Sequence, residues 1–131
     1  MRKACPLILL AVLLAFGACL VQFNSAEAKD IWVDHWESEN LDIYMQDDTL
    51  QANSKGYSRY FSVHTKKVRN GQLLGYIEWE FEKTGTTDMW RYSTNEMDGS
   101  HTTVVIPRNK LFEACMKKLG WPFEIVDLWY Y

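Results

Sequence analysis

Alternating apolar and polar residues over positions 56–83 predict two long antiparallel strands joined by a tight turn. The stretch is GYSRYFSVHTKKVRNGQLLGYIEWEFEK, with Asn70 and Gly71 near its middle. Asn-Gly between two alternating runs is a strong hairpin signal, because both residues tolerate positive φ angles. We expect this hairpin to form the centre of the fold.

The register of the hairpin is predicted from the side chains that would share a buried face. A two-residue turn at Asn70-Gly71 would place apolar residues opposite glutamates. A three-residue loop, residues 69–71 with Gly71 in the left-handed region, shifts the alignment by one and gathers the apolar side chains on one face. We therefore predict the three-residue loop. The expected cross-strand neighbours are Val63 with Ile77, Phe61 with Trp79, and Arg59 with Phe81.

This register predicts one apolar and one polar face, as in a half-exposed antiparallel sheet. The apolar face would hold Phe61, Val63, Ile77, Trp79 and Phe81. Exposed glutamates on a strand are usually only solvated, but the rings between them make this polar face a candidate surface for binding a partner. Its candidate residues are Tyr60, His64, Tyr76, Glu78 and Glu80.

The rest of the chain after residue 30 predicts further strands and one helix. Phe112, Cys115, Met116 and Leu119 form an apolar stripe at helical spacing. Pro107 suits the start of that helix and Gly120 its end. The expected strands are 31–36, 41–46, 49–52, 89–94 and 101–106, with turns at 47–48 and 53–56 and a closing strand or docked tail within 121–131. We predict an α+β fold: a twisted antiparallel sheet of six or seven strands, with the helix 108–119 packed on its apolar face.

The first 28 residues resemble a secretory signal peptide. A basic start (Arg2, Lys3) precedes a long apolar run that ends at Ala26-Glu27-Ala28, a small-x-small cleavage site. Two alternatives stay open. Residues 4–21 carry no charge and reach the lower length limit of a membrane anchor, and residues 16–19 resemble a lipoprotein cleavage box. We expect a signal peptide over 1–28 and a single exported domain over 29–131.

Charge and cysteine content narrow the function. Cleavage after Ala28 would leave a mature chain with a net charge of −4, which disfavours nucleic acid and anionic membranes as partners because both need a basic patch. The mature chain would hold one cysteine, Cys115, so no disulfide could form within it. Cys115 lies in the middle of the helical apolar stripe, and we expect a buried, inert thiol rather than a nucleophile.

Candidate chemistry is sparse. His35, His64 and His101 fall on three different expected elements without metal-ligand spacing, so we expect no metal and no cofactor. Aromatic residues are abundant instead, and most should fill the core of a small domain without disulfides. Rings near strand ends or the terminus are candidates for exposed stacking surfaces: Trp36, Trp90, Trp129, Tyr130 and Tyr131.

The order of aromatic motifs resembles a known family. Ile31-Trp32-Val33 is followed by the strand-turn residues 42–50, then by Tyr76-Ile77-Glu78-Trp79-Glu80-Phe81, by Trp90-Arg91-Tyr92 and by one helix. This pattern is similar to small exported domains of Gram-negative bacteria related to surface-adhesin protein E. The resemblance covers most of residues 30–120. It implies an antiparallel sheet with a helix, a periplasmic or surface location, and, as in some members, binding of envelope or host proteins. The adhesin is disulfide-bonded, and this chain departs from that pattern.

We therefore expect a non-enzymatic secreted, periplasmic or cell-surface protein that binds an envelope or host protein. The alternative is a module that binds carbohydrate or peptidoglycan, which would need coplanar exposed rings with polar neighbours. A small hydrolase is a third hypothesis, and it would need a deep pocket with perturbed acids or histidines. Contact with a membrane is expected only if the N-terminal segment is retained or lipidated.

Overall fold

The computed structural model describes residues 30–85, 88–97 and 103–131. Six antiparallel strands follow one another in a single sheet in the order β1-β2-β3-β4-β5-β6. The strands are β1 (Asp30–Trp36), β2 (Leu41–Lys55), β3 (Ser58–Arg69), β4 (Gln72–Lys83), β5 (Arg91–Thr94) and β6 (Val104–Val105). The helix α2 (Lys110–Leu119) and a small separate hairpin, β7 (Ile125–Val126) with β8 (Trp129–Tyr130), complete the fold. The predicted α+β architecture is confirmed.

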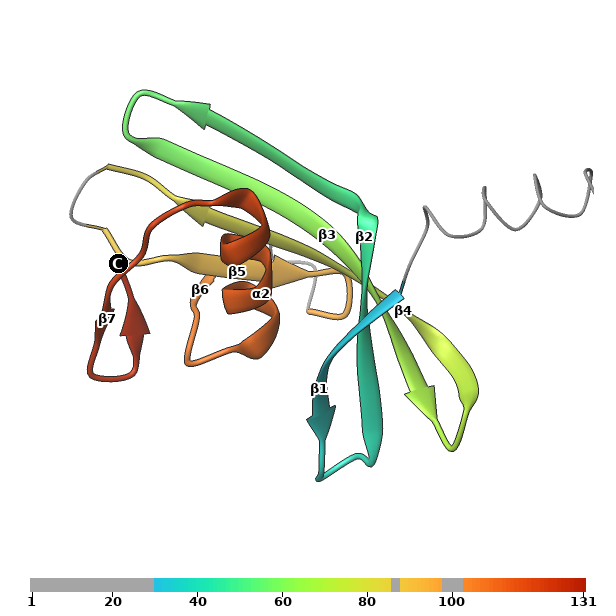
Figure 1. Ribbon diagram of the computed structural model, residues 1–131. Coiled ribbons are helices and arrows are strands. Elements are labelled where there is room, and N and C mark those ends of the chain that lie inside the picture. The colour runs from blue at the N-terminus through green and yellow to red at the C-terminus, as the bar shows by residue number, and fades with distance from the viewer. Residues whose placement is uncertain (1–29, 86–87, 98–102) are drawn as a thin grey trace, which may run out of the picture.

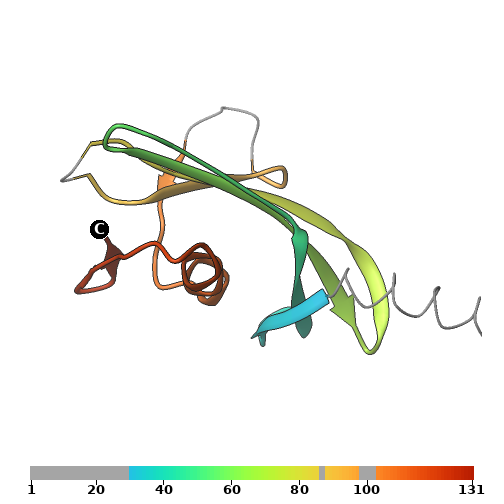
Figure 2. The same ribbon diagram turned by 45° about the horizontal axis from the view of Figure 1, so that its top comes forward.

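The helix lies against one face of the sheet, and the β7–β8 hairpin lies on the same side (Figures 1 and 2). We call this the inner face and the opposite one the outer face. The far end of the β3–β4 hairpin extends beyond the helix (Figure 2). The signal-peptide prediction concerns residues outside the described part of the chain. Within the described residues, no helix is long and apolar enough to cross a membrane.

The helix has well-formed ends. The side chain of Asn109 accepts a hydrogen bond from the Phe112 amide at 2.9 Å, which caps the first turn. Gly120 ends the helix with φ at 71°, a left-handed conformation that glycine adopts without steric cost. The predicted end of the helix is thus confirmed, whereas its start lies two residues after the predicted one.

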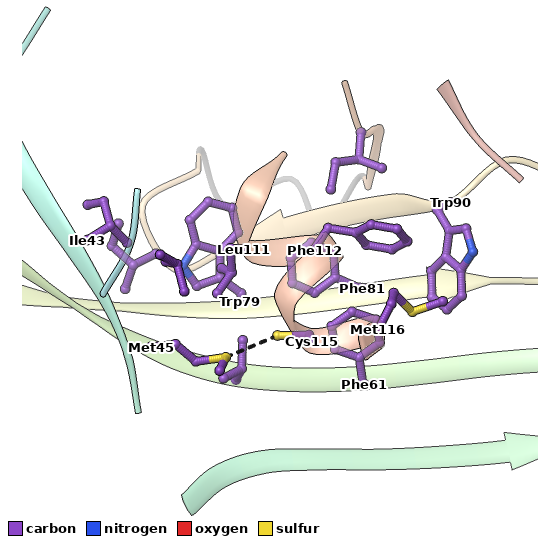
Figure 3. Close-up of a cluster of buried hydrophobic side chains, with 14 of the residues drawn as sticks. Ile43, Met45, Phe61, Trp79, Phe81, Trp90, Leu111, Phe112, Cys115 and Met116 are labelled. Atoms are coloured by element: carbon purple, nitrogen blue, oxygen red, sulfur yellow. Dashed lines mark hydrogen bonds between the residues drawn. The ribbon is translucent and has the colours of Figure 1, made fainter. Parts of the chain in front are cut away.

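The core is the layer of side chains between the sheet and α2 (Figure 3). Phe61 and Phe81 face each other across β3 and β4 with ring centres 4.6 Å apart. Phe112 of the helix packs against both, and its ring centre lies 4.2 Å from that of Tyr130. Cys115 is fully buried beside Met45, with 3.5 Å between the sulfur atoms. The predicted inert position of this thiol agrees with its pKa, which burial raises to about 12.

The predicted hairpin loop and register are wrong, although the sorting of the faces is right. Asn70 and Gly71 both have positive φ, 50° and 78°, and form a two-residue turn between Arg69 and Gln72. Leu74 is then an extra residue of β4, since Leu73 pairs with Val68 while Gly75 pairs with Lys67. The resulting pairs are Val63 with Trp79, Phe61 with Phe81, and Arg59 with Lys83.

The physical reason is the two-residue period of a strand. The observed alignment of β3 on β4 differs from the predicted one by two residues, so it buries the same side chains. The requirement that apolar side chains share one face excludes a register shift of one residue between β3 and β4, but it does not exclude a shift of two. The bulge at Leu74 restores the apolar match that a two-residue turn alone would lose.

The predicted turn at 47–48 is also wrong, and so is the prediction for residues 53–55 of the loop 53–56, because β2 is one strand of 15 residues that ends at Lys55. Only Gly56 of that loop lies in the turn before β3. Its pairing with β3 breaks between Gln46 and Gln51, whose partners are His64 and Ser62. Thr49 bridges the break: its hydroxyl accepts from the His64 amide at 2.8 Å and donates to the Gln46 carbonyl at 2.6 Å. A side chain thus replaces a backbone partner, and the strand bends instead of ending (Figure 1).

The remaining predicted strands are shorter than expected. β5 begins at Arg91, two residues after the predicted start. β6 covers only Val104–Val105 of the predicted strand 101–106, of which residues 101–102 lie outside the described part of the chain. The C-terminal segment pairs with itself as β7–β8 and does not close the main sheet.

Candidate functional site

The outer face of the sheet brings together all five candidate residues of the β3–β4 hairpin. Side chains alternate along each strand, so the buried positions Phe61, Val63 and Thr65 leave the positions between them on the outer face. The register places His64 directly opposite Glu78. The remaining candidates lie on both sides of that pair: Tyr76 opposite Lys66, Glu80 opposite Ser62, and Tyr60 opposite Glu82.

Tyr60 interacts with Glu80 on the outer face. Its ring is 38% exposed. Its pKa is raised, chiefly by partial burial and then by the negative charge of Glu80. Tyr60 is therefore a neutral hydroxyl that can donate a hydrogen bond at physiological pH.

Three glutamates of β4 form an acidic ridge on the outer face, namely Glu78, Glu80 and Glu82. Within the described residues none of them forms an ion pair, whereas six other acidic side chains do. Arg91 of β5 is the residue in register with Glu82. Glu78 and Glu80 are exposed and Glu82 is half-buried. The exposed part of the ridge suits positively charged groups on a partner.

The end of the outer face nearest the Asn70-Gly71 turn is apolar. One cross-strand row contains Trp32, Tyr44, Lys66 and Tyr76, each in register with the next. Trp32 and Tyr76 are each 50% exposed. Leu73 and Leu74 of β4 add further exposed apolar surface. We call the outer-face residues Trp32, Tyr44, Leu73 and Tyr76, with the exposed bulge residue Leu74 next to Leu73 in the chain, the apolar end.

A shallow hollow of about 300 Å³ is lined in part by Tyr44 and Leu73 of the apolar end. Lys66 forms part of its lining and is held by Asp30, with 2.7 Å between Nζ and Oδ2. This hydrogen bond raises the pKa of Lys66. The lining residues are Asp30, Tyr44, Lys66, Val68, Gly71 and Leu73.

A hydrogen-bonded cluster fixes the exposed indole of Trp32. Its Nε1 donates to Oδ1 of Asp42 at 3.0 Å, and Nδ1 of His35 lies 3.0 Å from the same oxygen. The bond from Trp32, followed by the bond to His35, lowers the pKa of Asp42. The ring is therefore exposed but held in one orientation, as a preformed contact surface requires.

The apolar end adjoins an unpaired strand edge. β5 pairs with β4 only from Trp79 to Glu82, and the Asn95 side chain accepts from the amide of Glu78. Backbone groups alternate in direction along a strand, so those of Tyr76 point the same way as those of Glu78. Among the described residues no strand pairs with Gln72–Ile77 on this side.

The candidate exposed rings were predicted with mixed success. Trp90 and Tyr130 are buried in the core, so their assignment to the surface was wrong. Trp129 is 36% exposed, while Trp36 and Tyr131 are half-buried. The most exposed tryptophan of the described chain, Trp32, was missed. The signal for it was the strand alternation in residues 31–36, which a bulge between Trp32 and Asp34 obscures.

Metal-ligating side chains do not cluster in the described part of the chain. No group of three or more His, Cys, Asp or Glu side chains there could hold a metal ion. His35 and His64 lie on the outer face in different cross-strand rows, and His101 falls outside the described residues.

Comparison with known proteins assigns the chain to no family. No family model, no curated protein and no solved structure matches the chain. The resemblance to surface-adhesin protein E stays a prediction.

Proposed function

We propose that this chain is a non-enzymatic exported protein that binds another protein through the apolar end of its outer face and the adjoining edge of β4. The observation that carries this proposal is the coincidence of exposed apolar side chains with unpaired backbone. Leu73, Leu74 and Tyr76 are 48–50% exposed along the free edge. No charged residue occurs between Gln72 and Ile77.

Soluble proteins normally protect a free strand edge with charges or proline, because it pairs with other chains. This edge has a bulge at Leu74 but neither charge nor proline. Beside exposed aromatic rings, it is suited to a partner that adds a strand and inserts side chains between the rings. The acidic ridge next to it favours a partner segment with lysine or arginine following the apolar part.

The signal-like N-terminal segment and the resemblance to exported adhesins support an envelope or host protein as that partner. Both are properties of the sequence, and the proposal of an exported location rests on them.

Capture from an envelope extract with the full chain as bait tests this proposal. Leu74→Lys would place a charge on the free edge and should abolish capture. Leu128→Lys is the matched control, because Leu128 is 62% exposed at the β7–β8 turn, away from the outer face. Equal loss of a captured protein with both variants, or retention with both, would contradict the proposal.

One observation favours a carbohydrate as a second candidate ligand. Trp32, Tyr44 and Tyr76 lie in one cross-strand row with Lys66 between the tyrosines, and Asp30 and Asp42 are close by. Rings flanked by polar groups are suited to stacking on sugars. Titration with soluble peptidoglycan fragments distinguishes the two candidates, since sugar binding should be lost in Trp32→Ala and retained in Leu74→Lys.

A further inference from the structure

A second hollow lies on the inner side of the sheet, between the β2–β3 turn and the segment that follows α2. Its volume is about 210 Å³. We propose that it binds a small organic anion composed of one aromatic ring and one carboxylate. This site is separate from the proposed protein-binding surface. Its lining consists of Tyr57, Arg59, Lys83, Gly85, Trp90, Met116, Trp121 and Pro122.

Two cationic side chains face each other at this hollow. Arg59 and Lys83 are direct cross-strand partners, and they share the inner face with the buried pair Phe61 and Phe81. Like charges directly opposite each other on a sheet destabilise it. Neither cation forms an ion pair within the described residues, and no carboxylate lines the hollow. A bound anion would relieve this repulsion.

The guanidinium of Arg59 is held in place by groups that use only part of its donor capacity. Nη1 donates to the carbonyl oxygens of Gly56 at 2.8 Å and Ser58 at 3.1 Å. Its Cζ lies 5.9 Å from the ring centre of Trp121, within range of a cation–π contact. Nε and Nη2 make no hydrogen bond with the described residues, so these donors remain for a carboxylate.

The other walls are apolar and favour a ring on the anion. Trp90 and Trp121 stack with ring centres 6.4 Å apart, and Met116 and Pro122 lie beside them. A cavity of about 150 Å³ accommodates benzene in a protein core. A hollow of about 210 Å³ therefore has room for one ring and one carboxylate. Tyr57, which is 74% exposed, offers a further ring to the ligand.

A ring with a carboxylate has two sources, a free aromatic acid or the C-terminal residue of a peptide that ends in phenylalanine. Both present the same group to Arg59 and Lys83. A free acid needs no further contacts, whereas a peptide would extend out of the hollow.

NMR titration of the ¹⁵N-labelled full chain with phenylacetate tests the proposal. We expect saturable shifts of the indole signals of Trp90 and Trp121 and no shift of Trp32. Lys83→Met should weaken binding by about tenfold or more, since it removes a charged donor, and Lys83→Arg should retain it. Lys117→Met is the matched control, because Lys117 is an exposed lysine on α2 that does not line the hollow.

Neutral and inorganic ligands provide the outcomes that overturn the proposal. If phenylacetamide bound as tightly as phenylacetate, the two cations would contribute nothing to binding. If inorganic phosphate bound as tightly as phenylacetate, the aromatic ring would contribute nothing. Unchanged affinity in Lys83→Met would also overturn it. A Gly-Gly-Phe peptide with a free or amidated terminus separates the sources: preference for the free peptide over phenylacetate identifies a chain terminus, and the reverse identifies a small acid.

Discussion

Thr65, a fully buried threonine, makes the sharpest stability prediction. Its Oγ1 accepts a hydrogen bond from Nε1 of Trp79 at 2.9 Å, beneath the helix. Thr65→Val keeps the shape of the side chain and removes the acceptor. The Trp79 indole, only 5% exposed, would then retain a donor with neither a protein partner nor water.

The cost follows from that unsatisfied donor. A buried polar group left without its partner costs about 1–3 kcal/mol, more than the net value of the hydrogen bond itself. In a Trp79→Phe background the donor is already absent, so Thr65→Val should cost close to nothing there. The coupling free energy between the two positions should therefore be about 1 kcal/mol or more.

Urea unfolding of the wild type, both single variants and the double variant, followed by circular dichroism, measures this coupling. The slope of the free energy of unfolding against urea should be the same in all four, which shows that the unfolded state is unchanged. Each kcal/mol should also lower Tm by roughly 4–8 °C in a domain of this size. An equal cost of Thr65→Val in both backgrounds would refute the reasoning.

Three further predictions concern α2 and its contacts. Asn109→Ala removes the helix cap and should lower the free energy of unfolding by about 1 kcal/mol. Gly120→Ala places a Cβ at a φ of 71° and should also lower the free energy of unfolding. An unchanged urea midpoint in either variant would contradict the assigned helix ends. Cys115 should not react with a thiol reagent at pH 8 in the native state, because burial raises its pKa to about 12. Labelling should occur only at the rate of unfolding. Rapid labelling would show that the thiol is accessible. Burial also raises the pKa of Tyr130 above its ordinary value of 10.0, so the stability that its neutral phenol contributes should be present below pH 10 and be lost as the pH rises through the raised pKa. Tyr130→Phe should lack this alkaline loss when urea midpoints are compared from about pH 8 upward, and an identical pH profile would count against it.

The sequence predicted the features that depend on local periodicity. The prediction failed where a side chain takes the place of a backbone hydrogen-bond partner. The helix, its glycine end and the buried face of the hairpin follow from apolar spacing, which the core confirms. The bend of β2 does not follow from spacing, because the Thr49 hydroxyl keeps the strand continuous across Asp47-Asp48. Aspartates in sequence favour a turn, and only the position of β3 decides otherwise.

The candidate site was predicted in part for the same reason. Tyr60, His64, Tyr76, Glu78 and Glu80 belong to one hairpin, so alternation alone places them on one face. The contribution of β1 and β2 to the candidate site could not be predicted, because it depends on the register of strands that are distant in the sequence. Trp32 and Tyr44 join Tyr76 only through the pairings of β1 with β2 and of β2 with β3. The hollow beside Arg59 likewise needs Trp121, which lies 62 positions further along the chain.

Hydrogen exchange at the Tyr76 amide tests the central claim most directly, because that amide lies on the free edge of β4. In the isolated full chain it should exchange rapidly, unlike the amides of the buried core strands. Addition of the captured partner should protect it and leave amides at the β2–β3 turn unchanged. Protection already present in the isolated chain, or none gained in the complex, would contradict the proposal that a partner adds to this edge.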